Sequence, residues 1–217
     1  MKSDKTDLMV SGLSKRYEKG PYIFEDLSHT FKSGTATALI GPNGAGKTTL
    51  IKLLSLLSYP TKGQIHLGPL DIHQSPYDYL KEMGMVYDEP DLPGYLNSIE
   101  LLEWILRQRV KWDECSSDQI NDLLDDLNLD ERREKIIATY SSGMLKKIQI
   151  ASALIFDPKL ILMDEPLRGL DEESRIAALK LLKDYVEAGG ILVMASHNKI
   201  ILEDLCSEVI KFPLGTN

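Results

Sequence analysis

Cysteine, long apolar runs and positive charge are all scarce in this chain. Its 217 residues include two cysteines, Cys115 and Cys206, which form no C-x-x-C pair. Neither a disulfide scaffold nor a zinc site is therefore expected. The apolar runs are a few residues long, as at residues 160–163, whereas a membrane-spanning helix needs about 20. The opening residues MKSDKTDLMV lack the apolar block of a secretion signal, which predicts a cytoplasmic chain.

Basic residues are outnumbered by acidic ones. The chain has 25 Lys and Arg against 33 Asp and Glu, a formal net charge of −8. Binding along a nucleic-acid backbone requires a basic face, so no nucleic-acid partner is expected. The hydrophobic content of 43% and charged content of 27% are those of an ordinary globular protein. The length fits one domain, or one domain with a sizeable inserted lobe.

The hydrophobic pattern changes twice along the chain. Up to about residue 90, short apolar runs separated by Gly and Pro predict strands, among them runs at 8–10, 22–24 and 27–31 and a buried strand at 35–40. Over residues 91–156, apolar residues recur at helical spacing and are interleaved with aspartates, which predicts helices with an acidic, solvated face. Buried strands then return at 160–163 and 191–195, on either side of an amphipathic helix at 172–188. This alternation predicts an α/β fold.

A glycine-rich loop follows the strand at 35–40. The sequence GPNGAGKT fits G-x-x-x-x-G-K-[ST] and precedes a predicted helix over residues 47–57. Glycines let successive N–H groups face one concave anion site, and the helix adds the positive end of its dipole. Lys47 is expected to reach the β- and γ-phosphates, Thr48 to bind Mg²⁺, and Thr49 to bind the α-phosphate. The predicted nucleotide site comprises Gly41, Pro42, Asn43, Gly44, Ala45, Gly46, Lys47, Thr48 and Thr49.

Polar side chains follow two buried strands. Asp164 and Glu165 end the strand at 160–163, on the side where ligand sites of open α/β sheets form. Asp164 is a predicted Mg²⁺ ligand, and Glu165 is the candidate general base that orients a water toward the γ-phosphate. His197 follows the strand at 191–195 and is a candidate donor to the γ-phosphate.

The order of these motifs resembles an ATP-binding cassette (ABC) ATPase along nearly the whole chain. GPNGAGKTT looks like the Walker A loop, and LILMDEP looks like the Walker B strand with Glu165 as its catalytic residue. Gly169-Leu170-Asp171 resembles the D-loop, and His197 the switch histidine. Tyr17 lies upstream of the glycine loop where the family has an aromatic side chain that stacks on adenine.

The segment YSSGM resembles the ABC signature loop, usually written LSGGQ. Ser141 and Gly143 match the usual form, whereas Ser142 and Met144 depart from it. The variant is similar to that of many ABC-2-type exporters. The resemblance implies a loop at a helix N-terminus that contacts the γ-phosphate bound to another subunit. It therefore implies a second cassette, in a homodimer or heterodimer, with Asp171 at the dimer seam.

Asp88 is a second departure from the family pattern. In MVYDEP it stands where the family has a glutamine that binds Mg²⁺ and the attacking water. Aspartate also offers oxygen to Mg²⁺, but it is shorter and charged. We expect this departure to affect coupling and hydrolysis rate more than nucleotide binding.

The resemblance also implies an architecture and a function. The expected fold is a P-loop NTPase core with a mostly parallel sheet, an N-terminal antiparallel β-subdomain and an inserted α-helical subdomain. The core should occupy about residues 1–90 and 157–217 of a single nucleotide-binding domain, and the helical subdomain about 91–156. ATP and Mg²⁺ are the implied cofactors. Hydrolysis would drive transport, more specifically export, through separate transmembrane permease subunits that dock near residues 88–96 and hold the chain at the inner face of the cell membrane.

Three other functions stay open from the sequence. A soluble ABC ATPase acting on DNA or the ribosome usually has tandem cassettes, a coiled-coil insertion or basic arms, which this chain lacks. A nucleotide-binding regulatory subunit with weak turnover is favoured by Asp88 and disfavoured by Glu165 and His197. A P-loop kinase of a small metabolite would leave YSSGM and the Asp164–Glu165 pair unexplained.

Overall fold

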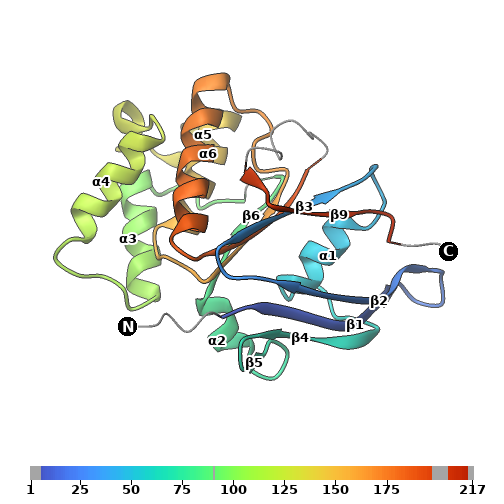
Figure 1. Ribbon diagram of the computed structural model, residues 1–217. Helices are drawn as coiled ribbons and strands as arrows, with labels where there is room; N and C mark the ends of the chain where they lie inside the picture. The colour runs from blue at the N-terminus through green and yellow to red at the C-terminus, as the bar shows by residue number, and fades with distance from the viewer. Residues whose placement is uncertain (1–5, 90, 197–204, 215–217) are drawn as a thin grey trace.

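The computed structural model describes residues 6–89, 91–196 and 205–214. It contains two β-sheets with helices packed against them (Figure 1). Among these residues, no helix combines the length and the apolar character needed to span a membrane. His197 falls outside the described ranges, so its role beside the γ-phosphate stays a prediction.

The first sheet is antiparallel and built by the N-terminal part of the chain. Its strand order is β2-β1-β4-β5. These strands are β1 (Leu8–Arg16), β2 (Tyr22–Phe31), β4 (Lys62–Leu67) and β5 (Leu70–Asp71). The expected antiparallel β-subdomain is confirmed. Two separate runs were expected at residues 22–24 and 27–31, but they form one strand, whose register against β1 shifts near Asp26, where φ is +52°.

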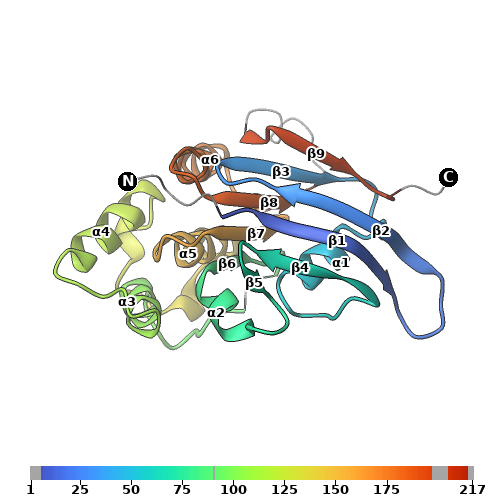
Figure 2. The same cartoon turned by 60° about the horizontal axis from the view of Figure 1, so that its bottom comes forward.

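The second sheet is parallel throughout the described residues. Its strand order is β6-β7-β8-β3-β9. The strands are β3 (Thr35–Ile40), β6 (Met83–Val86), β7 (Leu160–Asp164), β8 (Ile191–Ala195) and β9 (Glu208–Lys211). Figure 2 shows the antiparallel sheet lying against this one. Because all five strands run in one direction, their carboxyl ends share one edge, and the glycine loop, Asp88, Asp164 and Glu165 lie there.

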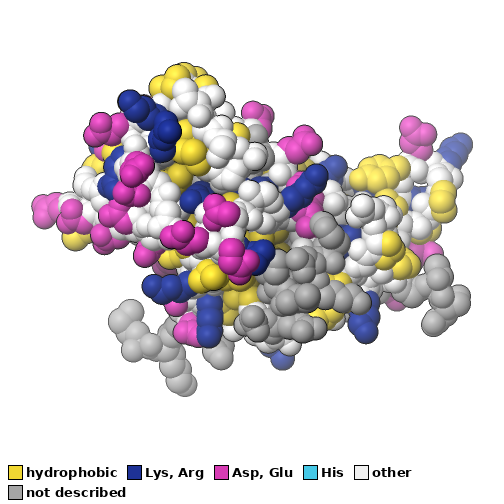
Figure 3. All heavy atoms as spheres, turned by 90° about the horizontal axis from the view of Figure 1, so that it is seen from above, with side chains coloured by type: hydrophobic (Ala, Val, Ile, Leu, Met, Phe, Trp, Pro, Cys, Tyr) yellow, Lys and Arg dark blue, Asp and Glu magenta, His cyan; other side chains and the backbone are white. Residues whose placement is uncertain are grey.

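The helices are α1 (Lys47–Leu54), α2 (Pro76–Lys81), α3 (Ser98–Gln108), α4 (Ser116–Asp126), α5 (Ser142–Leu154) and α6 (Glu172–Glu187), with 3-10 turns η1 (Asp130–Arg132) and η2 (Ile137–Thr139). Helices α3 to α6 lie on the opposite face of the parallel sheet from β1 and β2, whereas α1 and α2 pack in the same hydrophobic cluster as these two strands. Helix α1 ends at Leu54, earlier than the expected residue 57, because Leu56 takes a φ of +62°. The acidic face expected over residues 118–126 is confirmed, and acidic side chains gather on this side in Figure 3.

Alternate side chains of the central strands enter two different hydrophobic clusters. In β7, Leu160 and Leu162 pack in the cluster that includes β1, β2 and α1. Ile161 and Met163 pack in the cluster that includes α3, α4, α5 and α6. Both faces of the strand are thus buried, which explains why its sequence is a continuous apolar run. The same alternation in β8 leaves the parallel sheet between two separate cores.

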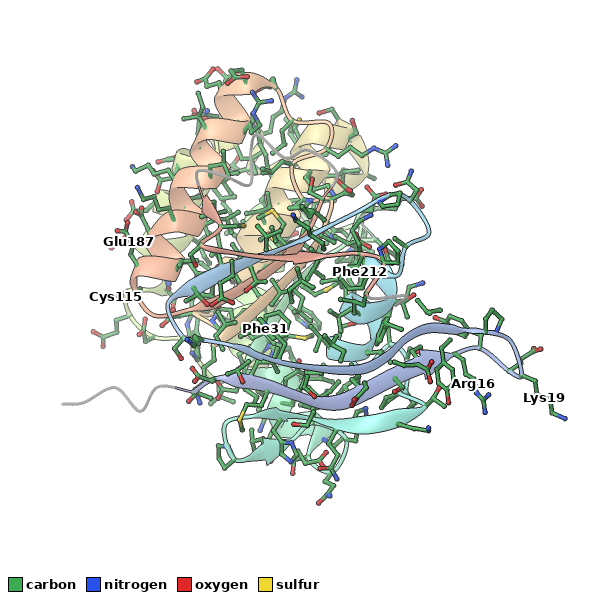
Figure 4. All side chains as sticks on the ribbon, turned by 45° about the vertical axis from the view of Figure 1, so that its right-hand side comes forward. Arg16, Lys19, Phe31, Cys115, Glu187 and Phe212 are labelled. Atoms are coloured by element: carbon green, nitrogen blue, oxygen red, sulfur yellow. The ribbon has the colours of Figure 1, made fainter. Side chains whose placement is uncertain are left out.

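Phe212 joins the two sheets near the glycine loop. Its ring meets the ring of Phe24 edge-on, with the centroids 6.3 Å apart. Phe24 belongs to β2, whereas Phe212 directly follows β9 (Figure 4). The aromatic pair thus anchors the antiparallel sheet beside the carboxyl end of β3.

Candidate active site

One cavity of about 550 Å³ collects the predicted catalytic and metal-binding residues that the structure describes and part of the glycine loop. It is lined by Asn43, Gly44, Gly46, Lys47, Thr48, Thr49, Asp88, Asp164, Glu165 and Arg168. These residues come from the loop after β3, the start of α1, the segment after β6 and the end of β7. The parallel sheet thus brings together groups that are more than a hundred residues apart in the sequence, and it adds Arg168, for which the sequence predicted no role.

Close packing explains the glycines of the loop. Gly46 has a φ of +109°, and a Cβ atom there would lie 2.7 Å from Cγ2 of Ile23. A Cβ on Gly41 would lie 2.4 Å from the carbonyl oxygen of Phe212. Strand β2 and the residue after β9 therefore back the loop, and a side chain at either glycine would push it out of place.

Lys47 directs its charge into the glycine loop. Its side chain is buried, and Nζ donates to the carbonyl oxygens of Gly41 at 2.8 Å and Pro42 at 3.0 Å. The ammonium group is thus held against the loop whose N–H groups were predicted to bind phosphate. This arrangement supplies a positive charge to an anionic ligand at short range.

Asp164 and Thr48 form the oxygen-rich part of the cavity. The Thr48 side chain hydrogen-bonds to the Asp164 carboxyl group. Burial raises the pKa of Asp164; the Thr48 hydrogen bond opposes this rise, whereas the nearby charge of Glu165 adds to it. Across the described residues, no group of three or more His, Cys, Asp or Glu could cage a metal ion. Mg²⁺ commonly needs only one or two carboxylates together with substrate phosphates, so Thr48, Asp164 and Asp88 fit this ion.

Glu165 has an unusual backbone conformation. Its φ of +47° lies in the left-handed region that non-glycine residues seldom occupy. Its N–H donates to the Ala195 carbonyl at 2.9 Å, and Ser196 Oγ donates to Oε2 at 3.1 Å. The end of β8 thus orients the candidate base. Sequence reasoning gave Ser196 no role, although it adjoins the predicted His197.

Helix α5 holds the segment that carries Asp88. Lys146 is 2% exposed, and its Nζ donates to the carbonyl oxygens of Tyr87 at 2.5 Å and Asp88 at 2.8 Å. In the amide orientation that gives its NH₂ group and its oxygen a partner each, Gln149 donates to the Tyr87 carbonyl oxygen and accepts from the Tyr87 N–H, both at 3.0 Å. Burial lowers the pKa of Lys146, and the charge of Asp88 opposes that shift. From the sequence, Lys146 was only a basic residue after YSSGM. Its spacing of three residues from Gln149 puts both on one helix face, which could have indicated that they share a partner.

The carboxylate of Asp88 faces Arg168. Nη1 of Arg168 lies 3.0 Å from Oδ2 and 3.3 Å from Oδ1. Both side chains line the cavity. The predicted metal ligand is therefore held in an ion pair that the sequence did not indicate.

The signature-like residues lie at the start of α5, outside this cavity. Ser141 caps the helix, and its Oγ accepts from the Met144 N–H at 3.3 Å. A Cβ on Gly143 would lie 3.2 Å from the carbonyl oxygen of Gly169, so the two predicted loops touch within one chain. None of Ser141, Ser142, Gly143 and Met144 is among the described residues that line the cavity. Their contact with nucleotide across a dimer stays a prediction.

Asp171 has a structural role that the structure shows directly. It caps α6, where its Oδ1 accepts from the Ser174 N–H at 2.8 Å. That hydrogen bond lowers the pKa of Asp171. Its place at a dimer seam stays a prediction.

Tyr17 lies just beyond β1, on the hairpin whose tip carries Arg16 and Lys19 in Figure 4. Its side chain is 52% exposed, and Lys15 Nζ lies 4.6 Å from the centroid of its ring. Tyr17 does not line the cavity, but Ile23 of the same hairpin contacts Gly46. The hairpin therefore borders the glycine loop, and adenine stacking by Tyr17 stays a prediction.

Comparisons with known proteins agree with the predicted family and fold. A family model described as ABC transporter matches residues 24–168. The Linearmycin resistance ATP-binding protein LnrL of Bacillus subtilis (strain 168) is 32% identical over 203 residues, which cover 93% of this chain and 65% of that protein. The Doxorubicin resistance ATP-binding protein DrrA of Mycobacterium tuberculosis is 29% identical over 190 residues, which cover 87% of this chain and 57% of that protein. The chain thus spans less than two thirds of the length of either resistance protein.

A solved structure, described as the ATP binding subunit of an ABC transporter, has the same fold. Its TM-score is 0.89 at 27% identity, with 94% of this chain and 85% of that chain covered. The match to the family model spans the glycine loop, Asp88, the YSSGM segment and the end of β7. The chain belongs to the ABC transporter family and contains that family's ATP-binding ATPase domain.

Proposed function

We propose that this chain hydrolyses ATP to drive an ABC transporter, in the export direction, through separate transmembrane subunits. The observation that carries the proposal is the single cavity in which Lys47, Thr48, Asp164 and Glu165 meet. The Linearmycin and Doxorubicin resistance proteins and the YSSGM-type loop support export.

Each side chain has a distinct task in this proposal. The loop N–H groups and Lys47 bind the phosphates, and Thr48 and Asp164 supply oxygen ligands for Mg²⁺. Mg²⁺ held by these ligands would neutralise negative charge on the bound phosphates. Glu165, oriented by the end of β8, accepts a hydrogen bond from the attacking water and aligns it with the γ-phosphate.

A second cassette completes the site. Ser141 opens the 13-residue helix α5, so its first-turn N–H groups form an anion site that lies outside this chain's own cavity. We infer that these groups bind the γ-phosphate held by a partner cassette. ATP then stabilises the closed dimer, and hydrolysis releases it.

Exposed aromatic side chains support a permease contact near residues 88–96. Tyr87 is 39% exposed and Tyr95 79% exposed, and Trp104 on α3 is 55% exposed. Tyrosine and tryptophan are enriched at protein interfaces. Because Lys146 and Gln149 hold Tyr87, a permease bound here would act on both Asp88 and α5. That contact would place the chain at the inner face of the membrane.

One observation favours a second function, nucleotide-dependent regulation with weak turnover. Asp88 forms an ion pair with Arg168. While this ion pair persists, the Asp88 carboxylate is not available to bind Mg²⁺, and this would slow turnover.

The Glu165→Gln variant tests the proposed function. We expect it to bind ATP but not hydrolyse it, because the amide no longer accepts a proton from water, and to form an ATP-dependent dimer in size-exclusion chromatography. Glu114→Gln, at an exposed position outside the cavity, is the matched control and should hydrolyse ATP like the wild type. Hydrolysis by Glu165→Gln at the wild-type rate would refute the role of Glu165. Absence of the dimer would refute the two-cassette mechanism.

Two further measurements distinguish transport from regulation: the rate of ATP hydrolysis by the wild type, and the identity of the protein that copurifies with it. ATP binding without measurable wild-type hydrolysis would favour the regulatory function. Copurification of the chain with a transmembrane subunit from native membranes would support transport, and accumulation of cargo inside inverted vesicles would indicate export.

A further inference from the structure

The cavity contains two kinds of fixed positive charge with different partners. Lys47 is buried and bonded to carbonyl oxygens of its own loop. Arg168 has a 68% exposed side chain and is bonded to a carboxylate, that of Asp88, whose side chain is 35% exposed. Only the second arrangement neutralises an oxygen ligand that a divalent cation could otherwise use.

The backbone beside this carboxylate is fixed. The buried Lys146 holds the Asp88 carbonyl at 2.8 Å, and Gln149 holds both backbone groups of Tyr87. The main chain at Asp88 is thereby tied to α5, so the Asp88 side chain alone is left to turn. Its carboxylate contacts the Arg168 guanidinium, and Asp164, which would hold a cation, lines the same cavity.

We propose that Arg168 is a positioning residue that competes with Mg²⁺ for the Asp88 carboxylate, so that this ion pair sets the Mg²⁺ concentration needed for nucleotide binding. The inference rests on the proposed function of the cavity as an ATP and Mg²⁺ site. A guanidinium keeps its charge at every physiological pH, so Mg²⁺ displaces it only by outcompeting it. In this arrangement the Asp88 carboxylate has two states. It binds Mg²⁺ when Arg168 is displaced, and it is neutralised by Arg168 when Mg²⁺ is absent.

The exposure of Arg168 limits the size of the effect. Exposed ion pairs contribute little, which corresponds to about a two- to fivefold change in the Mg²⁺ concentration for half-maximal binding. Because salt screens an exposed pair, the change should shrink toward onefold at about 0.5 M salt. A purely structural role of Arg168 would give no such dependence on Mg²⁺.

The experiment follows binding of a fluorescent, non-hydrolysable ATP analogue (MANT-AMP-PNP) to the full chain while Mg²⁺ is titrated. Arg168→Met should lower the half-saturating Mg²⁺ concentration about two- to fivefold, and Arg168→Lys, which keeps the charge, should lower it less. Asp88→Asn should raise it, because the carboxylate is lost. Adding Arg168→Met to Asp88→Asn should cause no further change, because Arg168 acts through Asp88.

Three results would overturn the proposal. Arg168→Met could raise the Mg²⁺ requirement, which would make Arg168 a phosphate ligand. It could leave the requirement unchanged, or it could act equally in the presence and absence of Asp88. Binding in the presence of a chelator separates this proposal from the proposed function: Lys47→Ala should lose the analogue under all conditions, whereas Arg168→Met should bind it like the wild type when Mg²⁺ is absent. If Lys47→Ala binds like the wild type, it is the nucleotide site that is wrong.

Discussion

Replacing Lys146 by methionine removes the charged group that ties α5 to the segment after β6. Methionine keeps an unbranched apolar side chain of similar length, so the packing of the buried stem is largely retained. The change removes the two hydrogen bonds that Nζ donates to the Tyr87 and Asp88 carbonyl oxygens. It tests whether a buried lysine, rather than helix packing alone, holds Asp88 in the cavity.

The expected loss of stability follows from which carbonyl group is left without a donor. The Tyr87 carbonyl keeps the amide of Gln149, whereas the Asp88 carbonyl loses its donor. Hydrogen bonds from a charged group contribute about 1.5–3 kcal/mol each, and the burial cost of the ammonium, recovered in the variant, offsets part of this. We expect a loss of about 1–3 kcal/mol, or about 2–12 °C in melting temperature for a chain of this size.

Urea and thermal unfolding followed by circular dichroism measure this loss. Lys147→Met is the matched control, because Lys147 is also buried but makes only a 3.4 Å hydrogen bond to the Asn128 carbonyl. Hydrogen exchange gives the local readout, since the Tyr87 amide should exchange faster in Lys146→Met. Equal destabilisation by the two variants, with unchanged exchange at Tyr87, would refute the reasoning.

Two further predictions concern thiol reactivity and the glycine loop. Burial raises the pKa of Cys206 to about 11, so at pH 8 its iodoacetamide labelling, followed by mass spectrometry, should be about a hundredfold slower than that of an ordinary thiol and rise about tenfold per pH unit. The exposed Cys115 should react first, and equal rates would contradict the burial of Cys206. Gly46→Ala should abolish binding of a fluorescent ATP analogue, because the new Cβ meets Ile23. Gly44→Ala, with a φ of +77° but no atom within 4 Å of its Cβ, should bind it more strongly than Gly46→Ala does.

The sequence predicts the parallel sheet well because its strands are buried on both faces. Strand β8 has the expected bounds, and β7 extends one residue beyond them, to Asp164. Continuous apolar runs that end in polar residues leave little choice of structure at these positions. The N-terminal strands were underestimated: β1 continues to Arg16, although only its first residues are an apolar run, because pairing with β2 and β4 sustains it.

Tertiary contacts explain what the sequence left out of the site. Arg168 and Asp88 are 80 positions apart, and no local pattern relates them. Helix α2 was not predicted, because its six residues are held by the buried Tyr79, whose hydroxyl donates to the Leu54 carbonyl at the end of α1. The motif residues were predictable because a short linear pattern carries their chemistry, whereas their supporting partners depend on how distant elements pack.

Strand β7 packs in both hydrophobic clusters and ends at the carboxylate of Asp164. Leu162 belongs to the cluster beneath the antiparallel sheet and Met163 to the cluster beneath the helices, and Asp164 is the next residue. A shift of either packed layer therefore moves the backbone that places the same acidic group. Substitutions deep in either layer, outside the cavity, should therefore alter the Mg²⁺ affinity of the proposed site.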